Sequence, residues 1–91
     1  MQFAARLRDA VRSGDVTTSI RIWKSPRVKV GGRYPLAPGW VEVTSLMEIS
    51  LADVTDDMAR ESGFANRVDL LKTAKHGSGQ RVFFVRFRYA E

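Results

Sequence analysis

The amino-acid sequence predicts an α+β domain in which helices lie beside a small, curved mixed sheet or partly closed β-barrel. Alternating segments rich in β-branched and aromatic residues predict strands over residues 17–23, 40–51 and 81–90. Helical spacing and capping residues predict helices over residues 3–12, 55–63 and 66–77. A chain of 91 residues has room for one hydrophobic core, so we expect residues 1–91 to form a single domain.

The segment SGDVTTSIRIWKSP, residues 13–26, joins the first predicted helix to the first predicted strand. The helix is expected to end at Ser13 and Gly14, because glycine tolerates the left-handed conformation that closes a helix. Successive side chains of a strand face opposite ways. One face of this strand is apolar and is expected to face the core, with Thr18, Ile20 and Ile22. The other face is expected to line a cleft, with Thr17, Ser19, Arg21 and Trp23.

The next part of the chain is expected to form a loop and then a long strand. KSPRVKVGGRYPLAP, residues 24–38, contains three prolines and two glycines, which predict a loop with a short strand around residues 28–30. WVEVTSLMEISL, residues 40–51, alternates well enough for one long strand, which a β-bulge would bend.

The acidic middle of the chain is predicted to be helical. Thr55 can cap a helix whose first positions are Asp56 and Asp57, and Gly63 can end it. A second helix is expected over residues 66–77, with Asn66 as its cap and Gly77 at its end.

The closing segment RVFFVRFRYA, residues 81–90, carries the clearest strand pattern of the chain. Both faces are apolar in its first half, which is typical of a central strand, and Arg86 and Arg88 are expected to reach solvent. One face is expected to hold Arg81, Phe83, Val85, Phe87 and Tyr89, and the other Val82, Phe84, Arg86 and Arg88.

The charge of the chain is unevenly distributed. Residues 1–33 contain eight Arg or Lys and two Asp, whereas residues 42–70 contain seven acidic residues and two Arg. The segment 72–88 adds five cations and no acid. If the two basic ends meet, they form a cationic face that attracts phosphates. The alternative is that these cations only solvate a small domain.

Several classes of protein are disfavoured by composition. The chain has no cysteine, so disulfides and thiolate metal sites are excluded. His76 stands alone, and we expect no metal and no cofactor. No apolar run approaches the roughly 18 residues of a membrane span. Arg6 and Arg8 interrupt the first apolar stretch, so a secretory signal is not expected and the predicted location is the cytoplasm.

Three phrases together resemble the ASCH domain, a branch of the PUA-like superfamily. LRDAVRSGDVTTSIRIWKSPRVKVGGRYPL resembles the opening helix and the motif that follows it. VEVTSLMEISLADVTDDMARESGF and VFFVRFRY resemble a strand that leads into a helix and the closing strand of that family. The resemblance covers nearly the whole chain and implies a β-barrel-like fold with a cleft between barrel and helices. It also implies RNA binding, or chemistry on nucleic-acid bases.

Small bacterial members of the family include amidohydrolases that cleave N4-acetylcytidine with a Lys, a Thr and a Glu. Aligned with their motif, Gly14 and Arg21 match, Val16 takes the place of the lysine, and Ser19 that of the threonine. The glutamate position falls near Ser62, with Glu61 beside it. Valine cannot transfer a proton, and loss of a proton carrier typically costs ~10²–10⁴-fold in rate. The lysine-dependent reaction is therefore not expected.

We therefore expect a non-catalytic module, or one with altered chemistry, that binds RNA or a modified nucleoside in a basic cleft. Its expected binding residues are Gly14, Thr17, Ser19, Arg21, Trp23 and Lys24. An arginine fork beside an aromatic ring suits single-stranded nucleic acid. The same residues allow a structural interpretation, in which Arg21 pairs with Glu42 or Glu48 and Trp23 plugs the core.

Two other functions stay open on the sequence. The first is an amidohydrolase or ribonuclease that uses Ser19 and Glu61. The second is an adaptor whose acidic helices contact another protein. Because the alignment with the ASCH motif places Val16 at the lysine position, it predicts that Val16→Lys restores the missing cation without unfolding the domain.

Overall fold

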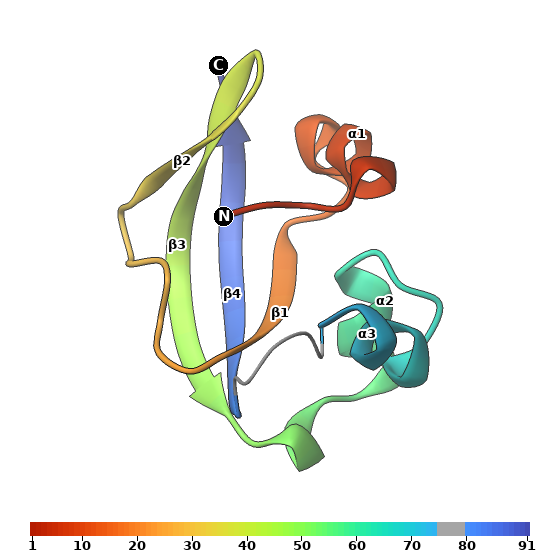
Figure 1. The fold of residues 1–91 in the computed structure, drawn as a ribbon. Helices are drawn as coiled ribbons and strands as arrows, with labels where there is room; N and C mark the ends of the chain where they lie inside the picture. Colours follow the sequence, from red (N-terminus) through yellow and green to blue (C-terminus); the bar gives the residue numbers. More distant parts are fainter. Residues whose placement is uncertain (75–79) are drawn as a thin grey trace.

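The computed structural model describes residues 1–74 and 80–91 (Figure 1). The chain forms three α-helices, a 3-10 helix η1 and four strands within these ranges. In chain order they are α1 Ala5–Ser13, β1 Thr18–Trp23, β2 Arg33–Leu36, β3 Gly39–Ile49, η1 Leu51–Asp53, α2 Asp56–Glu61, α3 Arg67–Ala74 and β4 Arg81–Ala90.

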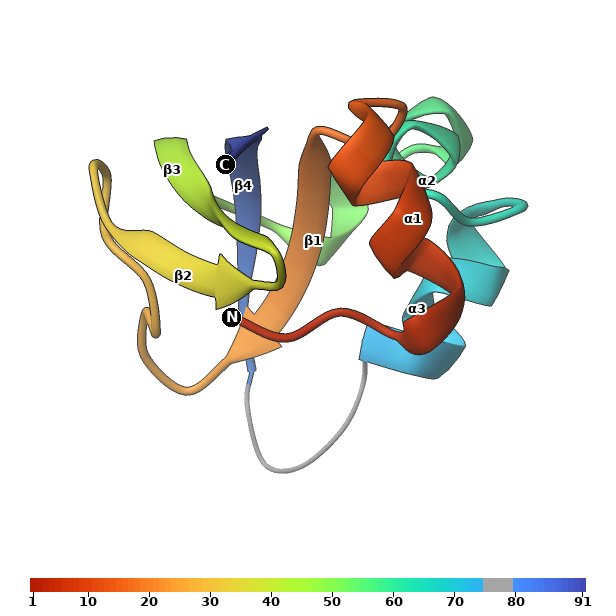
Figure 2. The ribbon, with the colours of Figure 1, turned by 90° about the horizontal axis from the view of Figure 1, so that it is seen from above.

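The four strands form one sheet in the order β1-β4-β3-β2, and every pairing is antiparallel. The sheet curls into a half-barrel, with α1 and the α2–α3 pair grouped beside β1 (Figure 2). The N-terminal segment crosses in front of the curled sheet before it enters α1. The predicted α+β class and barrel-like curl are thus confirmed, and β4 is a central strand, as its apolar pattern indicated.

Alternation along β4 divides the hydrophobic core between the two faces of the sheet. The inner face packs under α1 and the loop after β1, and its cluster contains Phe3, Val11, Val16, Trp23, Val28, Leu36, Val41, Val43, Phe83, Val85 and Phe87. The outer face packs under α2 and α3, and its cluster contains Ile20, Val54, Ala59, Leu70, Val82 and Phe84. The predicted assignment of the β4 side chains to two faces is therefore confirmed. The outer face of β2 and of the neighbouring ends of β3 and β4 carries no helix (Figure 1).

The local signals in the acidic region act as predicted. The Thr55 hydroxyl accepts a hydrogen bond from the Met58 backbone N–H at 3.1 Å and so caps α2. The Asn66 side chain accepts a bond from the Asp69 backbone N–H at 2.9 Å, at the start of α3. Gly77 and His76 lie outside the described residues. In β3 the register shifts between Val43 and Ser45, which confirms a β-bulge.

The loop after β1 differs from the prediction. Residues 28–30 form no strand, because Val28 turns into the inner core. The strand in this region is instead β2, which holds Pro35 and pairs with β3 through a tight turn at Ala37 and Pro38. Proline lacks a backbone N–H and is tolerated on an edge strand, and β2 is the edge of this sheet.

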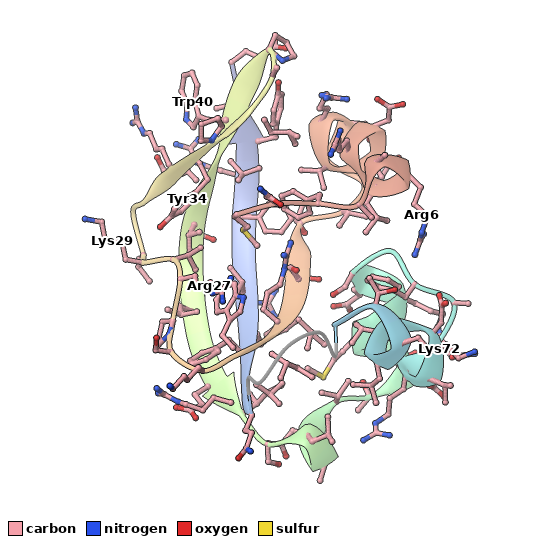
Figure 3. All side chains as sticks on the ribbon, viewed as in Figure 1. Arg6, Arg27, Lys29, Tyr34, Trp40 and Lys72 are labelled. Atoms are coloured by element: carbon pink, nitrogen blue, oxygen red, sulfur yellow. The ribbon has the colours of Figure 1, made fainter. Side chains whose placement is uncertain are left out.

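The helices are attached to each other through side chains. Arg6 of α1 donates to the Gly63 carbonyl at 3.0 Å, and its guanidinium lies 4.9 Å from the ring centre of Phe64 (Figure 3). Gly63 has φ +91°, and a Cβ there would meet Leu7 and Val16. This close approach explains why glycine ends α2. Within the described ranges, no helix has the length and apolar character needed to cross a membrane.

Candidate functional site

The structure brings together two of the residues expected to bind a ligand, Ser19 and Arg21. The Arg21 Nε donates to the Ser19 hydroxyl at 2.7 Å, and Nη2 donates to the Gln2 carbonyl. The guanidinium carbon lies 5.1 Å from the ring centre of Phe3. Phe3 in turn lies 5.2 Å from the ring of Phe87, centre to centre, which anchors it in the inner core. The arginine is therefore held on an aromatic platform.

Arg21 keeps hydrogen-bonding capacity for a ligand. A guanidinium has five N–H donors, and the two contacts above use Nε and one side of Nη2. Nη1 has no hydrogen-bond partner in the part of the chain that the structure describes. Arg21 is half-buried, so part of its side chain is sheltered and part reaches solvent, and we call the Nη1 side its free edge. This arrangement leaves donors available for an oxyanion.

The charge of Arg21 is not balanced by a carboxylate among residues 1–74 and 80–91. The alternative interpretation, in which Arg21 pairs with Glu42 or Glu48, is wrong. Glu48 accepts both bonds of a bidentate pair from Arg81, at 2.8 and 3.1 Å, and Glu42 lies between Arg33 and Arg88. The strand order explains why Glu48 does not pair with Arg21. Glu48 of β3 lies opposite Phe83 of β4, and β4 lies between β3 and β1.

Burial has an electrostatic consequence for Arg21. Desolvation lowers the pKa of the Arg21 guanidinium from its usual value. Arginine nevertheless keeps its charge in proteins at neutral pH. A half-buried cation without a carboxylate is stabilised by any anion that binds at its free edge, since that anion supplies the missing countercharge.

Arg8 adds a second cation to the same segment. Its Nε donates to the Phe3 carbonyl at 3.3 Å. The carbonyls of Gln2 and Phe3 are thus held by Arg21 of β1 and Arg8 of α1, and we call this pair of arginines the basic mouth. Arg27, from the loop after β1, lies in front of the sheet, on the side that the N-terminal segment crosses (Figure 3).

None of the other predicted binding residues is hydrogen-bonded to Arg21 or Arg8 among the described residues. Gly14 caps α1 with φ +84°, and Thr17 is exposed while its carbonyl accepts a bond from the Phe87 N–H at 3.0 Å. Lys24 is exposed beyond the end of β1. Trp23 is 9% exposed and packs on Phe83 with ring centres 5.7 Å apart, so it plugs the inner core and offers no open face for stacking.

Val16 does not occupy a cleft. It is 6% exposed and belongs to the inner core cluster. The prediction that Val16→Lys restores a motif cation therefore conflicts with the structure. The physical reason is that residues 14–17 connect α1 to β1, and the apolar side chain of Val16 packs in the inner core, close to Gly63 at the end of α2.

Ser19 and Glu61, the pair expected of an enzyme, are separated by the sheet. The Thr18 hydroxyl bonds the Ser62 hydroxyl at 2.9 Å, which joins the end of α2 to the outer face of β1. Ser19 projects to the opposite face, toward Arg21, because side chains alternate along a strand. Glu61 is exposed on α2, beside the outer contact.

The two basic ends of the chain do meet, because β1 pairs with β4. Strand alternation nevertheless divides their cations. Arg21 lies on the inner face, whereas Arg86 and Arg88 lie on the outer face, opposite Thr18 and Glu42 respectively. Among the described residues, the strand cations therefore lie on both faces of the sheet and do not form the single cationic face that the sequence suggested.

The platform under Arg21 was not predicted. Phe3 was predicted to lie in the helix of residues 3–12. In the structure it precedes α1 and packs in the inner core. The signal in the sequence is weak, since only the alternation Gln2, Phe3, Ala4 before the helix indicates extended chain. Among the described residues, no group of three or more His, Cys, Asp or Glu side chains could hold a metal ion.

The chain has no match among protein-family models, curated proteins or solved structures. The resemblance to the ASCH domain stays a prediction from the sequence.

Proposed function

We propose that this chain is an RNA- or nucleotide-binding module of the PUA-like, ASCH type that binds in the basic mouth beside Arg21. The ligand class is single-stranded RNA or a modified nucleoside carrying phosphate. Arg21 pairs with a phosphate through its free edge, and Arg8 adds a second positive charge.

The observation that carries this proposal is the half-buried Arg21 without a carboxylate partner among the described residues. A single exposed cation that no neighbouring side chain orients is common on protein surfaces and carries little information. A cation that is oriented by Ser19 and Gln2 and stacked on Phe3 has lost rotamer freedom before any ligand arrives. Such preorganisation raises affinity, because less entropy is lost on binding.

Hydrolysis by Ser19 is the weaker candidate. The Ser19 hydroxyl accepts its bond from Arg21, a cation that cannot act as a general base. Glu61 lies on the other side of the sheet, and position 16 is apolar. The geometry therefore favours binding over nucleophilic catalysis.

The test is the affinity of the protein for a short fluorescently labelled oligoribonucleotide, measured by anisotropy at low salt. Arg21→Ala is expected to weaken binding about tenfold, and to reduce the log–log salt slope by about 0.7, the value for one phosphate contact on a single strand. Arg21→Lys keeps the charge but loses the fork, and its affinity should lie between those of Arg21→Ala and the parent.

Arg60→Ala is the matched control. It also removes one positive charge, but Arg60 pairs with Asp57 on α2, among the acidic helices. We expect its affinity to stay within about twofold of the parent, because a solvent-exposed charge far from the contact acts only through screened electrostatics. If Arg21→Ala and Arg60→Ala lost the same amount of affinity for the oligoribonucleotide, the basic mouth would be rejected as the RNA-binding site.

A further inference from the structure

The outer face of β2 and β3 carries a second basic surface that is not part of the basic mouth. Arg33 lies with its guanidinium carbon 5.4 Å from the ring centre of Trp40, and Figure 3 shows Trp40 beside β2 and β3. A shallow hollow of 340 Å³ is lined by Arg33, Pro35, Gly39 and Trp40. This volume lies at the lower end of the range for ligand sites, which is about 300–1,000 Å³.

Cross-strand register explains why these side chains gather. Pro35 lies opposite Trp40, and Arg33 lies opposite Glu42. On the other side of β3, Arg88 lies opposite Glu42. Residues directly opposite in adjacent strands share a face. The floor of the hollow is thus apolar, and its margin is charged. We call the group Arg33, Trp40, Glu42 and Arg88 the outer platform.

The charge of the outer platform is positive. Glu42 accepts from Arg33 and from Arg88, each at 3.3 Å, so one carboxylate orients two guanidiniums. The Glu42 side chain is 21% exposed, whereas those of Arg33 and Arg88 are 64% and 63% exposed. The acid is therefore sheltered between two cations that face solvent. Arg86, which follows on the same face of β4, adds a further cation over the ring of Phe84.

We propose that the outer platform is a second contact site for single-stranded RNA, at which one base stacks in the hollow and the adjacent phosphates pair with Arg33 and Arg88. Bases of single strands stack on aromatic rings and on guanidinium planes, and Trp40 with Arg33 provides both. Charge complementarity identifies the occupant, since an apolar hollow bordered by two oriented arginines suits a flat ring joined to an anion. This inference deepens the proposed function and rests on it.

Gly39 lies at one end of the hollow, against the end of β4. A Cβ at this position would overlap the carbonyl of Ala90, which shows that β3 and β4 approach closely there. The Gly39 N–H also donates to the Tyr89 hydroxyl at 2.8 Å, so the turn is held firmly against β4. The platform therefore sits on a fixed part of the sheet, which limits the entropy lost on binding.

The experiment combines two readouts with a short oligouridylate of about ten residues. Anisotropy reports total affinity, and Trp40 fluorescence reports the outer platform, with Trp40→Phe used to subtract the emission of buried Trp23. Trp40→Ala is expected to weaken binding about five- to a hundredfold, the range for loss of one stacked base, whereas Trp40→Phe should lose less than about threefold. Trp40 emission should still be quenched in Arg21→Ala, at higher oligonucleotide concentration.

The outcomes separate the two proposals. One outcome is that Arg21→Ala loses affinity while Trp40→Ala and Arg33→Ala keep the affinity of the parent. This outcome would overturn the proposal that the outer platform binds RNA, and it would leave the proposal for the basic mouth standing. If no oligonucleotide binds, uridine 5′-monophosphate at millimolar concentration tests the platform alone: quenching of Trp40 supports it, and unchanged emission overturns it. A blue shift of Trp40 emission with rising protein concentration alone would assign this face to a second copy of the chain and also overturn it.

Discussion

Replacement of Val16 by lysine tests whether the turn after α1 closes the core or lines a ligand cleft. Val16 is 6% exposed and packs in the inner cluster. Burial of a valine side chain is worth about 1.5–3 kcal/mol, and an unpaired ammonium group adds a desolvation cost of several kcal/mol. The longer side chain would relieve part of that cost by extending its ammonium group to the surface. We therefore expect Val16→Lys to lower the free energy of unfolding by about 3–5 kcal/mol.

Urea denaturation followed by the fluorescence of buried Trp23 measures this change. A chain of this length is stable by only about 5–14 kcal/mol, so the loss is a large fraction of the total. Val16→Ala serves as the control for volume, with an expected loss of about 2 kcal/mol. Thr17→Lys serves as the control for charge, since Thr17 is exposed and its replacement should stay within about 0.5 kcal/mol. A Val16→Lys protein within about 1 kcal/mol of the parent would refute the placement of Val16 in the core.

Three further predictions concern stability. Thr55→Ala removes the cap of α2 and should cost about 1 kcal/mol in thermal or urea denaturation, while Thr55→Ser should keep most of that stability. Gly39→Ala should lower the melting temperature, because its Cβ overlaps the Ala90 carbonyl; an unchanged value would contradict that approach. Hydrogen bonds from the Ser50 backbone and side chain lower the pKa of Asp53 from 3.8. The stability that Asp53 provides is therefore present above about pH 4 and is lost as the pH falls through the lowered pKa. Asp53→Asn should flatten this part of the acid-unfolding curve. An acid-unfolding curve identical to that of the parent would contradict a stabilising role for the Asp53 carboxylate.

Strong local signals in the sequence predicted most of the secondary structure. The alternation in residues 81–90 identified β4 as a central strand with one solvent-exposed end, and Thr55 and Asn66 identified two helix starts. These features depend on residues within a few positions of each other, so a single sequence contains them. Edge strand β2 was missed because Pro35 and the neighbouring glycines are also typical of loops.

The site was predictable only in part, because its contacts join residues that are far apart in the chain. Alternation in β1 placed Ser19 and Arg21 on one face, as observed. It could not reveal that Trp23 on the same face would be covered by the returning loop, or that Phe3 would form the platform under Arg21. The hollow beside Trp40 depends on the pairing of β2 with β3, which follows from tertiary structure and not from the local pattern.

Binding of a phosphate at Arg21 can be observed directly in a crystal of the protein grown with a short oligoribonucleotide. We expect density for a phosphate within hydrogen-bonding distance of Arg21 Nη1, about 2.7–2.9 Å for a charge-assisted bond. Arg21 should keep its contacts with Ser19 and the Phe3 ring in that complex. Nucleic acid bound only along the acidic helices or the outer platform, with solvent at the free edge of Arg21, would contradict binding at the basic mouth.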